Sequence, residues 1–160
     1  MGEPMNVATD QPTTKDLLAR MDDAWSSFSH AVHALPTELL EQKLGEDQWS
    51  RKQMLAHIAT WHDLTVERLA GFLDSGLPTT IDEDEDTINA RAARGAEGRT
   101  TGEVLLALDE SYRHLRREVG RLSNEQLAMH EGWAPRVVAE NTFGHYSDHT
   151  ADLDRKSPHS

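Results

Sequence analysis

The chain has no cysteine among its 160 residues. This absence excludes disulfide bonds, thiolate metal ligands and a cysteine nucleophile. If the protein performs thiol chemistry, the thiol must therefore arrive as a co-substrate. The sequence also lacks any run of about 18 apolar residues, so it predicts no transmembrane helix.

Basic residues are scarce relative to acidic ones. Lysine and arginine total 16 against 28 aspartate and glutamate, which gives a net charge of −12. Nucleic acids and anionic membranes both require basic patches on the proteins that bind them, so we expect neither as a partner. Residues 1–14 lack a basic region followed by an apolar stretch, so no secretory signal is predicted and we expect a cytoplasmic protein.

Four segments have the periodicity of amphipathic helices, and none alternates with the period of two that is typical of strands. In the first segment, apolar residues recur every three or four positions from Leu18 to Leu35, before Pro36. The predicted helices span residues 13–34, 51–74, 101–121 and 136–153. The sequence therefore predicts an all-α four-helix bundle over residues 13–154, with flexible tails at 1–12 and 155–160.

An acidic run from Asp82 to Asp86 lies between the second and third predicted long helices. Such a run is typical of a solvated connector or of the negatively charged start of a short helix, which we expect over residues 87–94. A divalent ion could also bind there, although the spacing does not match a calcium loop. The role of the run stays open at this point.

Three histidines lie at inward-facing positions of the predicted helices. His145 and His149 are one turn apart on the same face of the fourth helix, with Cβ atoms about 5–6 Å apart, so they can share one metal ion. His57 interrupts an apolar run of the second helix in the same way. Buried imidazoles cost desolvation energy unless they are paired or ligated. We therefore predict a metal site at His57, His145 and His149, the alternative being core histidines with hydrogen-bond partners.

Other polar and aromatic residues are candidates for the surroundings of this site. Trp61 follows His57 by one turn and could form the wall of a pocket, to which we also assign Asn141 and Asp148. Asp148 either orients a ligand histidine or faces solvent. We expect His62 and His114 at the surface or at the rim of the bundle.

Two stretches, Trp49–Trp61 and Asn141–His149, carry a resemblance to a known family. In these two stretches the chain resembles the DinB-like superfamily. Within that superfamily it resembles the ClbS/DfsB branch and the mycothiol-dependent maleylpyruvate isomerase branch. The resemblance implies a four-helix bundle, often a homodimer. It also implies a divalent metal ion held by one histidine of the second helix and two of the fourth, which here are His57, His145 and His149.

The resemblance further implies a transferase or isomerase that uses a low-molecular-weight thiol on a small molecule. Three imidazoles leave coordination positions open, as in catalytic rather than structural sites. Nitrogen ligands suit zinc and nickel alike. Two other functions remain possible on this basis: a metal-activated hydrolase, and a non-catalytic protective protein of the ClbS/DfsB kind that binds a small molecule.

Overall fold

The structure, a computed structural model, describes residues 13–154 and is helical over most of this range. The helices are α2 (Thr14–His33), α3 (Thr37–Glu41), α4 (Arg51–Ser75), α5 (Glu85–Glu97), α6 (Thr101–Gly120), α7 (Asn124–Asn141) and α8 (Phe143–Asp154). Within the described residues no strand forms, and one isolated bridge joins Lys43 and Ser50. The predicted all-α fold is confirmed. The tails predicted at 1–12 and 155–160 lie outside the described residues.

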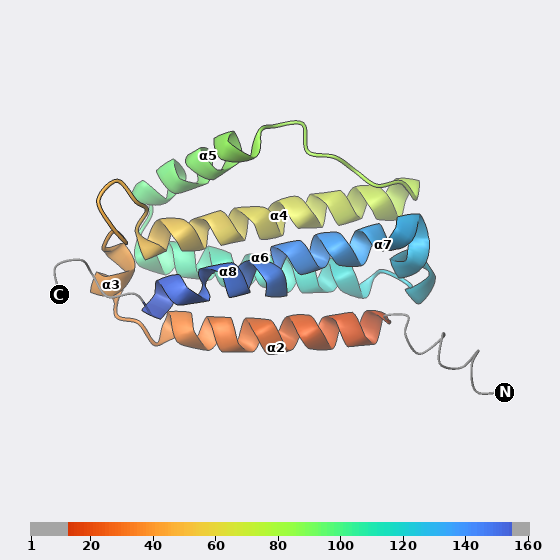
Figure 1. The fold of residues 1–160 in the computed structure, drawn as a ribbon, viewed down its shortest axis with the longest axis horizontal. Helices are drawn as coiled ribbons and strands as arrows, with labels where there is room; N and C mark the ends of the chain where they lie inside the picture. Colours follow the sequence, from red (N-terminus) through yellow and green to blue (C-terminus); the bar gives the residue numbers. More distant parts are fainter. Residues whose placement is uncertain (1–12, 155–160) are drawn as a thin grey trace.

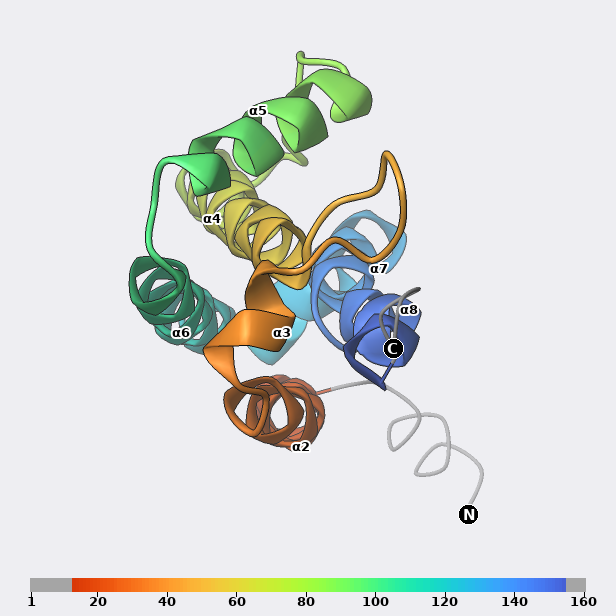
Figure 2. The same cartoon turned by 90° about the vertical axis from the view of Figure 1, so that its left-hand side faces the viewer.

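Long helices surround one core. Figure 1 shows α2, α4, α6 and the pair α7–α8 running alongside one another. The end view of Figure 2 places these elements around a common centre, with α5 outside α4 and α3 at the end where α2 stops and α4 starts. None of the helices in residues 13–154 is long and apolar enough to cross a membrane.

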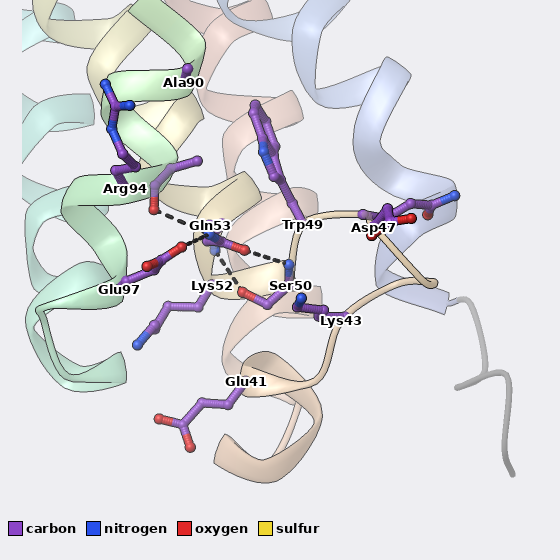
Figure 3. Close-up of a pocket in the computed structure, with 12 residues that line it drawn as sticks. Glu41, Lys43, Asp47, Trp49, Ser50, Lys52, Gln53, Ala90, Arg94 and Glu97 are labelled. Atoms are coloured by element: carbon purple, nitrogen blue, oxygen red, sulfur yellow. Dashed lines mark hydrogen bonds between the residues drawn. The ribbon is translucent and has the colours of Figure 1, made fainter.

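The start of α4 is fixed by a capping box. The Ser50 side chain accepts a hydrogen bond from the backbone N–H of Gln53, and Oε1 of Gln53 accepts one from the backbone N–H of Ser50 (Figure 3). These reciprocal bonds satisfy donors that the first turn of a helix leaves free. They also determine which direction His57 faces, since it follows on the same helix two turns later.

The structure differs from the prediction at residues 136–153, which form parts of two helices instead of one. Thr142 separates α7 from α8 because its backbone is non-helical, with φ −124° and ψ −104°. Its hydroxyl donates to the carbonyl of Val138, one turn earlier. Gly144 then passes so close to α7 that a Cβ atom would lie 2.8 Å from the carbonyl oxygen of Ala139. The break therefore sets the position of α8, which carries two of the predicted ligands.

Helix α7 is also interrupted near its middle. His130, Glu131 and Gly132 all have positive φ angles, of 53°, 57° and 77°. Nε2 of His130 donates to the carbonyl oxygen of Gly76 at 2.7 Å, which ties this turn to the end of α4. The helix that follows contains Pro135 near its start, as the sequence predicted.

The acidic run begins α5. The side chain of Asp84 caps this helix by accepting from the backbone N–H of Thr87, and Glu83 forms an ion pair with Arg91 at 2.6 Å. Helix α5 is longer than the predicted 87–94 and continues through Gly95. The run thus has the structural role of a negatively charged helix start.

Candidate metal centre

Three histidines from two helices converge at one point. Nε2 of His145, on α8, lies 2.9 Å from Nε2 of His57 on α4 and 3.2 Å from Nε2 of His149 on α8. One ligand atom from each residue lies within 4.8 Å of the others. Nitrogens bound to one ion at about 2.0–2.1 Å lie roughly 2.9–3.4 Å apart when the angle between them is near-octahedral or tetrahedral. The three predicted ligands are thus brought together and could hold one metal ion.

Hydrogen bonds orient two of the three rings. Oδ1 of Asn89, on α5, accepts from Nε1–H of Trp61 at 2.7 Å and lies 2.8 Å from Nδ1 of His57. Because an indole N–H only donates, the Asn89 atom is an acceptor, and Nδ1 of His57 must carry the proton. Nδ1 of His149 lies 3.3 Å from Oδ2 of Asp152, which favours the same tautomer. Both Nε2 lone pairs therefore point toward His145.

The rings of His57 and His145 are neutral at pH 7. Burial, and after it the positive charge of a protonated His149, lowers the pKa of His57 to about 4. The hydrogen bond to Asn89 acts in the opposite direction and raises this pKa. Burial and the charges of the other two histidines lower the pKa of His145 to about 3. Nδ1 of His145 is buried with no hydrogen-bond partner among residues 13–154. Because Nε2 of His57 and of His149 both accept, Nε2 of His145 carries the proton in the metal-free protein, and a bound cation would take the place of that proton.

A cavity of about 350 Å³ opens beside the three histidines. Its lining residues come from α4, α5, α7 and α8, and they are His57, Trp61, Arg68, Glu85, Glu140, Asn141, His145 and Asp148. Trp61, Asn141 and Asp148, the three residues assigned to a pocket from the sequence, all line this cavity. Asp148 is exposed on the rim, and the carboxylate that contacts a histidine of the cluster belongs to Asp152. Of the two positions left open for Asp148, the structure has the one that faces solvent, and Asp152 is a neighbour of the cluster that the sequence analysis did not name.

A second cavity of about 720 Å³ adjoins the cluster through Trp49. It lies between the start of α4 and the C-terminal half of α5, where Figure 3 shows Trp49 with the basic residues Lys52 and Arg94 and the acidic residue Glu97. The ring centre of Trp49 is 5.3 Å from that of His57. The same indole therefore lines this cavity and contacts a histidine of the cluster.

His62 is the main error of the sequence analysis. It was expected at the surface or rim, yet none of it is exposed. Its Nδ1 donates to Oγ of Ser111 at 2.8 Å, because the Ser111 hydroxyl itself donates to the carbonyl of Leu108. Nε2 of His62 accepts from the hydroxyl of Tyr146 at 2.7 Å. This chain of hydrogen bonds joins α4, α6 and α8 inside the core.

The burial of His62 has a signal in the sequence. Helix α4 packs against several elements, with α6 and α5 both in contact with it, so it buries more than one stripe. One of those stripes recurs at steps of three and four residues, and its members are Leu55, Ile58, His62, Thr65 and Leu69. The prediction for this helix considered only the apolar face that His57 interrupts, and so it placed His62 outside the core.

Replacing Tyr146 with phenylalanine should destabilise the protein by about 1–3 kcal/mol, because Nε2 of His62 then loses its donor in a fully buried place. Urea unfolding at pH 7 measures the effect. Tyr112→Phe is the matched control, since its hydroxyl binds Asp22, which is partly exposed and keeps its ion pair with Arg116. A loss for Tyr146→Phe no larger than for Tyr112→Phe would contradict the role given to the chain of hydrogen bonds.

Replacing Asn89 with alanine should weaken metal binding by about 10–100-fold, because Nδ1 of His57 loses the acceptor that fixes its tautomer and ring orientation. Competition with a chromogenic chelator at pH 7 measures the affinity. Asn124→Ala is the control, since this amide contacts Thr14 at the start of α2. Equal affinities for the two variants would show that Asn89 does not orient the ligand.

Comparison with known proteins supplies the family. The family model of the DinB superfamily matches residues 20–153, a range that contains His57, His145 and His149. No curated protein and no solved structure matches the chain. The match extends over most of the 160 residues and over the helices that supply the histidine cluster. The chain therefore belongs to the DinB superfamily.

Proposed function

We propose that this protein is a divalent-metal-dependent transferase or isomerase that uses a low-molecular-weight thiol on a small molecule. The observation that carries the proposal is the convergence of three imidazole groups beside an open cavity. Three protein ligands leave coordination positions for a substrate, as catalytic sites require. Zinc and nickel are the ions that the proposal includes, because both accept nitrogen ligands.

The residues of the site have separate roles in this proposal. A bound ion would supply Lewis acidity and lower the pKa of a thiol or water that binds it. Asn89 and Asp152 orient the rings of His57 and His149, so little ring reorganisation is needed when the ion binds. The thiol must come from outside because the chain has no cysteine.

The second candidate is a hydrolytic or non-catalytic protein that binds a small molecule and so protects against it. The observation that favours it is the 720 Å³ cavity, which is the larger of the two and is not lined by any histidine of the cluster. A protein that only binds a small molecule needs such a space and does not need a metal ion.

Elemental analysis followed by a thiol-transfer assay tests the proposal. We expect one zinc or nickel ion per chain, and metal-dependent replacement of chloride in an aryl chloride by the sulfur of an added thiol, with release of chloride and a proton. Chelation should abolish the reaction, and adding the metal back should restore it. Hydrolysis without thiol, or binding that survives chelation, would instead favour the second candidate.

We also propose that the protein is a homodimer, an inference supported by the family resemblance. Sedimentation equilibrium at high micromolar concentration should give twice the chain mass of 17.9 kDa. A monomer at every concentration would contradict the dimer and leave the metal centre unaffected.

A further inference from the structure

Among residues 13–154, Arg68 is the one lysine or arginine that lines the cavity beside the histidine cluster. It follows His57 by eleven residues on α4, a distance of about 16 Å along the helix axis. Trp61 lies between them, and these three residues occupy neighbouring positions on one face of the helix. The cavity therefore has the histidine cluster toward one end of this face and a guanidinium group toward the other.

The guanidinium of Arg68 has few partners for its donors. Its Nε is buried and has no hydrogen-bond partner among residues 13–154. Its Nη2 donates to the carbonyl oxygen of Thr79 at 3.4 Å, which is long for such a bond. The group also lies over the ring of Trp133, 5.4 Å from the ring centre. A buried N–H without an acceptor is costly, and an acceptor on a ligand would remove that cost.

The carboxylates around this cavity do not satisfy Arg68. Glu85, Glu140 and Asp148 are all exposed, so solvent and salt screen their charges. Arg68 is partly buried, and this burial lowers its pKa while the charge of Glu140 opposes the shift. Solvent therefore screens the positive charge of Arg68 less than it screens the negative charges on the rim. An oxyanion that entered the cavity would be attracted by Arg68 more strongly than the rim carboxylates would repel it.

We propose that Arg68 binds an oxyanion of the substrate or co-substrate, such as a carboxylate, while the reacting end of the same molecule lies at the histidine cluster. A guanidinium binds carboxylates through two parallel hydrogen bonds, which adds geometric selectivity to the charge. The ligand must be long enough to join the two ends of the cavity. This inference rests on the proposed function, because it assumes that a thiol reaches the metal.

A series of simple thiols tests the inference with the full chain loaded with cobalt, in which a thiolate ligand gives a charge-transfer absorbance. The probes are mercaptoacetate, mercaptohexanoate and mercaptoundecanoate, each compared with the mercaptoalkanol of the same length. The carboxylate should strengthen binding by about tenfold or more for a long chain and not for mercaptoacetate, which is too short.

Variants at Arg68 separate the possible outcomes. Arg68→Gln should remove the preference for the long carboxylate and leave binding of the alkanol unchanged, and Arg68→Lys should keep part of it. Arg113→Gln, an exposed change on α6, is the charge-matched control. A preference that survives in both Arg68 variants would overturn the inference. If no thiol of either kind changes the cobalt spectrum, the proposed function itself fails.

Discussion

Replacing His145 with alanine should abolish stoichiometric metal binding while the helices stay folded. Nε2 of His145 is 2.9 Å from the corresponding atom of His57 and 3.2 Å from that of His149, so it lies within hydrogen-bond distance of both. The loss should exceed the roughly 10–100-fold effect expected from a residue that only orients a ligand. Elemental analysis after dialysis against zinc or nickel measures it, and far-ultraviolet circular dichroism reports the helices.

The control for this change is His114→Ala, which removes an exposed histidine from α6. That variant should retain one ion per chain. His57→Ala and His149→Ala should lose the ion as His145→Ala does, because each removes one of three ligand atoms. Full metal content in His145→Ala would contradict the proposed centre.

The metal-free protein should lose stability steeply as the pH falls from about 6.5 to 4. Burial is the first cause of the lowered pKa of three histidines: about 4 for His57 and about 3 for His62 and His145. In the unfolded chain each of these histidines binds a proton near its ordinary pKa of about 6.5. The unfolded state therefore holds more protons in this range, and the free energy of unfolding decreases as the pH decreases.

Each proton held only by the unfolded chain contributes a slope of about 1.4 kcal/mol per pH unit. Urea unfolding of the chelated protein at several pH values between 6 and 4.5 measures this slope. His62→Gln should lower it by nearly one proton, since His62 is fully buried and both its ring nitrogens have partners. Identical slopes for the two proteins would contradict a neutral His62 in the folded state.

Periodicity and helix-end signals were sufficient to predict most of the fold. The first three predicted helices agree with α2, α4 and α6 to within one residue at each end, because capping residues and proline mark where they begin and end. The division at Thr142 carries no comparable signal. It depends on how closely Gly144 can approach the carbonyl of Ala139, which is a contact between helices rather than a local preference.

The histidine cluster could be predicted from helix periodicity, as most of the fold could. The residues that contact the cluster could not be predicted in this way. His57, His145 and His149 occupy inward positions of periodic helices, so their faces can be read from spacing. Asn89 reaches His57 only because α5 packs against α4, and the spacing of neither helix encodes that contact. Burial also lowers the pKa of His57 and His145 below the ordinary histidine value, an effect that depends on the packed structure.

The two indoles beside His57 allow metal binding to be followed by the intrinsic tryptophan fluorescence of the protein. The ring of Trp49 lies 5.3 Å from that of His57, and Trp61 shares the Asn89 oxygen with it. An open-shell ion such as nickel at the cluster should quench the emission of both indoles by energy transfer, whereas zinc, with a filled d shell, should change it only slightly. Trp25, stacked on Tyr112, should emit independently of the ion. A fluorescence titration of the native chain would therefore distinguish the two metals without any attached dye.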